Sequence, residues 1–168
     1  MRRGKTRTLG IMTNNNEIRQ QLDAIATWDA FFETRQLLAK WQPDDVYRAL
    51  LPLAISGRDG NAPHRAGCLL IELQPDCIEP LSEIVSKIHN SKWYVSFREV
   101  PFYLVTQFGK HVVLDVARKF LDSLPPNRTE HSRVESLIYW ASFSASDLCK
   151  GFHEWEFERF NEEAGNDS

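Results

Sequence analysis

Two glutamate–tyrosine pairs stand out among the side chains that could bind a partner. Glu99 precedes Tyr103 by four residues, and Glu135 precedes Tyr139 by the same spacing. On a helix this spacing places both members of a pair on one face. Tyrosine suits binding surfaces because it offers a large apolar body with a polar tip. We therefore expect these four residues to form a protein-binding surface, with packing of the tyrosines against neighbouring helices as the alternative.

The motifs of common catalytic and metal centres are incomplete in this chain. Gly4-Lys5-Thr6 resembles the end of a phosphate-binding loop but lacks the preceding strand and the glycine spacing of that motif. Cys149 and His153 are spaced to share a helix face, yet a zinc site needs four ligands and no second pair accompanies them. We expect no catalytic residues, no metal and no cofactor.

Composition indicates one globular domain without a membrane segment. The chain has 168 residues, of which 42% are hydrophobic, so it can bury a core of its own. No apolar run approaches the roughly 18 residues of a membrane helix. Three cysteines without CxxC spacing indicate a reducing compartment, and we expect the cytoplasm. The net charge of −3 argues against general nucleic-acid binding.

The charge is unevenly distributed along the chain. Residues 1–16 carry four basic side chains and no acid, whereas residues 154–168 carry six acids against Arg159 alone. We expect a basic N-terminal segment over 1–16, a helical domain over 17–162 and an acidic tail over 163–168. Two solvated ends are the simplest interpretation, and a specific electrostatic role is the alternative.

An internal repeat organises the central part of the chain. Residues 38–44 and 70–76 both read Leu-x-x-apolar-Gln-Pro-Asp, and an apolar stripe with helical spacing follows each of them. Arginines recur at intervals of 30, 33 and 35 residues, which agrees with the repeat spacing. The pattern predicts an all-α fold with helices over 17–27, 30–41, 43–56, 62–74, 76–90, 93–108, 110–123, 131–143 and 146–162.

The repeat resembles HEAT repeats, which are helix pairs that stack into an α-solenoid. The resemblance rests on the repeat and on aspartates six residues before arginines, at Asp29/Arg35 and Asp59/Arg65. It implies a short right-handed solenoid of about four helix pairs plus a C-terminal helix, with a hydrogen-bonded ladder between these pairs. It also implies that the second helix of each pair lines a concave face. Lys92 before Arg98 and Asn127 before Arg133 depart from the ladder pattern.

The repeat and the missing catalytic motifs together favour a non-enzymatic adaptor or scaffold that binds another protein along the concave face. We expect a monomer or a weak dimer. One alternative is a small inhibitor of the immunity-protein type, which would bind one basic partner. Another is a HEAT-like DNA glycosylase that cradles an alkylated base with side chains such as Trp93, Arg98 or Trp140, a role for which the sequence shows no matching motif.

Overall fold

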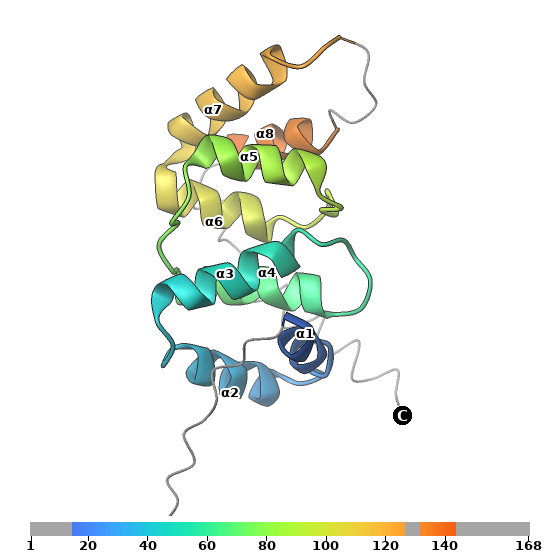
Figure 1. The fold of residues 1–168 in the computed structure, drawn as a ribbon, viewed down its shortest axis with the longest axis vertical. Helices are drawn as coiled ribbons and strands as arrows, with labels where there is room; N and C mark the ends of the chain where they lie inside the picture. Colours follow the sequence, from blue (N-terminus) through green and yellow to red (C-terminus); the bar gives the residue numbers. More distant parts are fainter. Residues whose placement is uncertain (1–14, 127–131, 144–168) are drawn as a thin grey trace, which may run out of the picture.

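A computed structural model describes residues 15–126 and 132–143 of the chain (Figure 1). These ranges contain helices and no strand, which confirms the all-α class. The eight described helices are α1 (Asn15–Asp23), α2 (Trp28–Leu38), α3 (Pro43–Ala54), α4 (Ala62–Leu73), α5 (Leu81–Asn90), α6 (Glu99–Phe108), α7 (Lys110–Asp122) and α8 (Ser132–Ser142). The expected helix over 146–162 and the acidic tail lie outside the described residues.

Two helices begin later than the sequence pattern predicts. Helix α5 begins at Leu81 instead of residue 76, because Gln74 ends α4 in the left-handed conformation (φ 45°, ψ 49°) and Pro80 is the residue before α5. Helix α6 begins at Glu99 instead of residue 93, so that Pro101 lies in its first turn. A proline is tolerated there because the first N–H groups of a helix have no partner within the helix.

The helices are distributed along the longest axis of the molecule, with α2 near one end and α7 at the other (Figure 1). Helix α3 packs against α4, and α7 packs against α8. Helices α4, α6 and α8 contact one another in succession, and α5 contacts α7. In contrast, α3 and α5 are not closely packed, which leaves an open space between them.

Helix α4 is tied to both helices that precede α3. The Asp23 carboxylate at the end of α1 accepts a hydrogen bond from the backbone N–H of Ala62 at 2.7 Å. On α2, Arg35 forms an ion pair with Glu72 of α4 at 3.3 Å. These contacts hold the first two helices against α4.

The contact between α4 and α6 depends on a glycine. A Cβ atom placed on Gly67 of α4 would lie 2.8 Å from the Cβ atom of Glu99 on α6, which is closer than real Cβ contacts allow. Both helices are buried at this point, and Val100 and Leu104 of α6 belong to the hydrophobic core. Glycine at position 67 therefore permits the two backbones to approach closely.

We predict that Gly67→Ala destabilises the fold. Helix propensity alone would make alanine the more stable residue by up to about 1 kcal/mol. Steric overlap with Glu99 opposes that gain, because overpacking a buried contact costs about 1–3 kcal/mol. We expect a net loss in the free energy of unfolding, measured by urea denaturation followed by circular dichroism. A stabilised variant would contradict the close approach of α4 and α6.

Candidate functional site: a groove between helices α3 and α5

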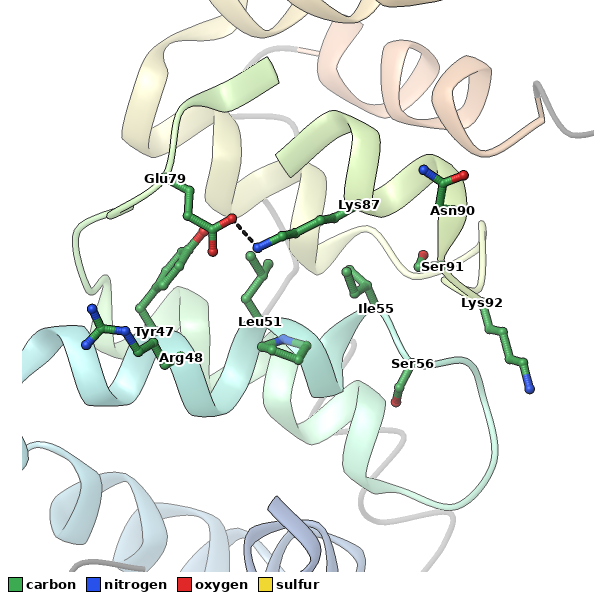
Figure 2. Close-up of a pocket in the computed structure, with 11 residues that line it drawn as sticks. Tyr47, Arg48, Leu51, Ile55, Ser56, Glu79, Lys87, Asn90, Ser91 and Lys92 are labelled. Atoms are coloured by element: carbon green, nitrogen blue, oxygen red, sulfur yellow. Dashed lines mark hydrogen bonds and ion pairs between the residues drawn. The ribbon is translucent and has the colours of Figure 1, made fainter. Parts of the chain in front are cut away.

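A groove of about 610 Å³ separates α3 from α5 (Figure 2). One wall comes from α3 and the residues just after it. The opposite wall comes from Glu79 before α5, from α5 itself and from the residues that follow it. The lining residues are Tyr47, Arg48, Leu51, Pro52, Ile55 and Ser56 on the first wall and Glu79, Lys87, Asn90, Ser91 and Lys92 on the second.

The groove combines an apolar lining with a positively charged rim. Leu51, Pro52 and Ile55 supply the apolar surface. The rim holds three cations, Arg48, Lys87 and Lys92, against the single carboxylate of Glu79. The groove is therefore locally basic on a chain whose net charge is −3.

The three rim cations differ in their partners. Lys87 forms an ion pair with Glu79, as Figure 2 shows. Arg48 and Lys92 are exposed, and neither forms an ion pair or a side-chain hydrogen bond with any described residue. Two cations at this rim thus remain available for an external anionic group.

The segment that carries Glu79 is held in place by two side chains of α6. The Gln107 Nε2 group donates to the Gln74 Oε1 atom at 3.1 Å, and its Oε1 atom accepts from the backbone N–H of Cys77 at 3.3 Å. The Tyr103 hydroxyl donates to the carbonyl oxygen of Pro75 at 2.6 Å. These bonds explain how a segment without regular structure presents Glu79 at a defined place.

Burial keeps the ionisable groups beneath this end of the groove neutral. Burial raises the pKa of the Tyr47 hydroxyl above its ordinary value, and the nearby carboxylate of Glu79 raises it further. Burial also raises the pKa of Tyr103, as does its hydrogen bond with Cys77. The pKa of the Cys77 thiol is raised mainly by burial, so the thiolate that makes cysteine nucleophilic is disfavoured. The chemistry of this region therefore suits binding better than proton transfer.

The two glutamate–tyrosine pairs, which we expected to share one binding surface, differ in burial. Glu135 and Tyr139 are exposed on α8, and Tyr139 is 58% exposed. Glu99 and Tyr103 are instead buried, at 1% and 0% exposure. The expectation that all four line one binding surface therefore does not hold for the pair on α6. The reason is that α4 covers Glu99 and the segment 74–80 covers Tyr103.

Glu99 belongs to a buried polar cluster that joins α4 to α6. The cluster also contains His64, Arg65 and Cys68 of α4, and all four side chains are at most 3% exposed. Arg65 Nη1 lies 2.9 Å from His64 Nδ1, and His64 Nε2 lies 3.1 Å from Glu99 Oε1. The second approach is within ion-pair distance but is not aligned as a hydrogen bond.

The contact with Arg65 determines the protonation state of His64. A guanidinium group can only donate hydrogen bonds and stays charged in proteins. His64 Nδ1 must therefore accept from Arg65, so the proton of the neutral ring is on Nε2, which lies 3.7 Å from Cys68 Sγ and 3.1 Å from Glu99 Oε1. In this arrangement a neutral imidazole lies between the guanidinium group of Arg65 and the carboxylate of Glu99.

The same protonation state argues against a metal ion at this cluster. Ligand atoms of His64, Cys68 and Glu99 lie within 4.8 Å of one another, as a metal site requires. A metal on Nε2 would need the lone pair of that nitrogen, which is protonated here because Nδ1 accepts from Arg65. Among the described residues the cluster supplies three protein ligands, where structural zinc sites use four. Its donor set therefore fits a packing role better than a metal centre.

Other residues singled out by the sequence have different surroundings. Trp93 is buried at 2% exposure, in a segment without regular structure between α5 and α6. The Nε1 group of Trp140 donates to the carbonyl oxygen of Val95 at 2.8 Å and so fastens α8 to that segment. Cys149 and His153 lie outside the described residues.

Sequence reasoning missed the groove. Its walls come from two helices that are distant in the chain, and the three rim cations do not form a motif. Leu51 and Ile55, which line the groove, are buried and belong to the hydrophobic core, so their apolar character gave no sign of a second surface.

Comparisons with known proteins identify no relative: no family model, no curated protein and no solved structure matches this chain. Within the described residues, no helix is both long enough and apolar enough to cross a membrane. A function can therefore be proposed only from the geometry of the groove and of the buried cluster.

We predict that Glu99→Gln lowers the free energy of unfolding by about 1–3 kcal/mol, because a buried carboxylate beside His64 is replaced by an amide whose buried donors need new partners. Glu135→Gln makes the same chemical change at the matching position of α8. It should change stability by less than about 0.5 kcal/mol, because Glu135 is exposed. Urea denaturation of both variants tests the difference, and equal effects would show that the buried contacts of Glu99 do not contribute to stability.

We predict that Tyr103→Phe loosens the segment before α5. Losing the hydroxyl leaves the Pro75 carbonyl without its bond from Tyr103 and should cost about 1–2 kcal/mol. Hydrogen exchange of backbone N–H groups in residues 74–80 should become faster. Tyr139→Phe is the matched control and should alter neither quantity, because its hydroxyl makes no hydrogen bond with the described residues. Unchanged exchange in Tyr103→Phe would show that other contacts hold the segment.

Proposed function

We propose that this chain is a non-enzymatic protein-binding adaptor built as a short right-handed HEAT-like solenoid of about four helix pairs. The succession of contacts from α4 to α6 to α8 supports this proposal, because stacked helix pairs repeat the same contact between neighbours. The groove between α3 and α5 is the surface on which we place the partner.

The observation that carries the proposal is the basic rim around an apolar lining. An apolar groove with charged groups at its edge suits a peptide segment, since the apolar contacts supply affinity and the charges select the partner. The rim has three cations against one acid, so the preferred segment is acidic and carries at least one large apolar side chain. Arg48 and Lys92 would meet its carboxylates.

This location differs from the concave face that the resemblance implies. The second helices of the pairs, α4 and α6, pack closely against each other. The open space lies between the first helices, α3 and α5. We therefore assign binding to the side of the first helices.

The charge of the groove also bears on the alternative functions. An inhibitor of the immunity type was expected to bind a basic partner, whereas this rim favours an acidic one. For a glycosylase, Trp93 was a candidate to cradle a base, but its side chain is buried. Among the described residues, the groove lining contains no tryptophan and no aspartate. The adaptor is the function that these surfaces support best.

We predict that reversing the rim charges with R48E/K87E/K92E abolishes partner binding. The test is affinity capture from host lysate, quantified by mass spectrometry. We expect a partner retained by the original chain to fall at least about tenfold, because each reversal replaces attraction by repulsion. Circular dichroism establishes that the variant remains folded.

The matched control is K40E/R118E/K119E, which makes the same charge change at cations that do not line the groove. Capture of the partner by this control should remain close to that of the original chain. If both variants lose the partner equally, net charge explains the binding and the groove does not. If neither variant loses it, the partner binds elsewhere.

A further inference from the structure

We infer that, in the absence of a partner, the groove between α3 and α5 is occupied by the acidic stretch 154–168 of the same chain. This inference rests on the proposed function and adds regulation to it. An acidic partner segment would bind by displacing the chain's own acidic stretch. Three observations support this occupant: the charges, the order of the residues and the available length of chain.

The charges of the groove and of the stretch are complementary. The rim carries Arg48, Lys87 and Lys92 against Glu79, and two of these cations lack any ionic partner among the described residues. The stretch 154–168 carries six acids against Arg159. No other stretch of this length in the chain has so large an excess of acids.

The stretch alternates acidic and aromatic residues, and this order suits a groove that has an apolar lining and a charged edge. Residues 154–158 read Glu-Trp-Glu-Phe-Glu, so each aromatic residue has a glutamate on both sides. An aromatic ring placed against Leu51, Pro52 and Ile55 would therefore bring at least one carboxylate towards the rim. Trp155 and Phe157 are the side chains that we assign to the apolar lining.

The chain is long enough for this contact to form within one molecule. Glu154 follows Phe143, the last described residue, by eleven positions, which span up to about 36 Å when extended. Near that end, Trp140 is bonded to Val95, three residues from Lys92 at the rim. A tethered segment has an effective concentration of the order of millimolar, so weak ion pairs suffice to hold it.

Lysine acetylation of the full chain tests the occupant directly. The variant E154K/E156K/E158K removes the complementary charge, and E33K/D122K/E135K makes the same change at exposed acids that do not line the groove. We expect Lys92 of the original chain and of the control to react about fivefold more slowly than Lys92 of E154K/E156K/E158K. Lys40 and Lys119, which do not line the groove, serve as internal standards in every sample.

Carbodiimide cross-linking identifies which molecule supplies the stretch. In an equal mixture of ¹⁴N- and ¹⁵N-labelled chains, the inference requires links from Lys87 or Lys92 to glutamates of 154–163 in which both peptides carry the same label. Links with mixed labels would overturn it in favour of a second copy. Equal acetylation of Lys92 in all three chains would overturn it in favour of an open groove.

Failure of the inference is distinguishable from failure of the proposed function. If the groove is open but R48E/K87E/K92E still loses the partner, the adaptor proposal stands and only self-occupation is refuted. If both hold, E154K/E156K/E158K should capture more partner than the original chain does. Unchanged capture in that variant, together with the acetylation difference, would show that the stretch occupies the groove without competing with the partner.

Discussion

The close contact between α4 and α6 is the constraint on which the rest of the structure depends. It requires two features at one place: the missing side chain of Gly67 and the buried side chain of Glu99 packed against it. Helix α4 also packs against α1, α2 and α3, and α6 also packs against α7 and α8, so this contact joins the two halves of the described fold. The groove between α3 and α5 lies beside this contact.

The repeated Gln-Pro-Asp segment shows how far the sequence predicts the fold. At its first occurrence Pro43 begins α3, as the pattern indicates. At its second occurrence Pro75 instead lies in an irregular segment, where Tyr103 and Gln107 of α6 supply the hydrogen bonds that a helix would otherwise make. Local sequence predicted a break in both places. At the second occurrence Pro80, five residues after Pro75, also limits where the helix can begin, and the contacts of α6 with the segment between them are what one sequence does not display.

The glutamate–tyrosine pairs show why the candidate site was harder to predict than the helices. Spacing alone makes Glu99/Tyr103 and Glu135/Tyr139 equivalent, and the helical periodicity correctly placed each pair on a helix. Their burial differs because α4 and the segment 74–80 cover α6, whereas Tyr139 on α8 remains exposed. The groove, in turn, lies between α3 and α5, which are separate in the chain, and no local pattern marks it.

The charges of the chain divide into two kinds with different consequences. Arg65 is buried and contacts His64, and His64 in turn lies near the carboxylate of Glu99. Substituting any of these three residues should therefore change the free energy of unfolding. Arg48 and Lys92 are exposed and lack such compensation among the described residues, so they contribute little to stability. The electrostatic potential of exposed cations influences the rate and selectivity of association with a charged partner. This influence weakens as the salt concentration rises. In the proposed function these two cations therefore act in association, and folding does not depend on them.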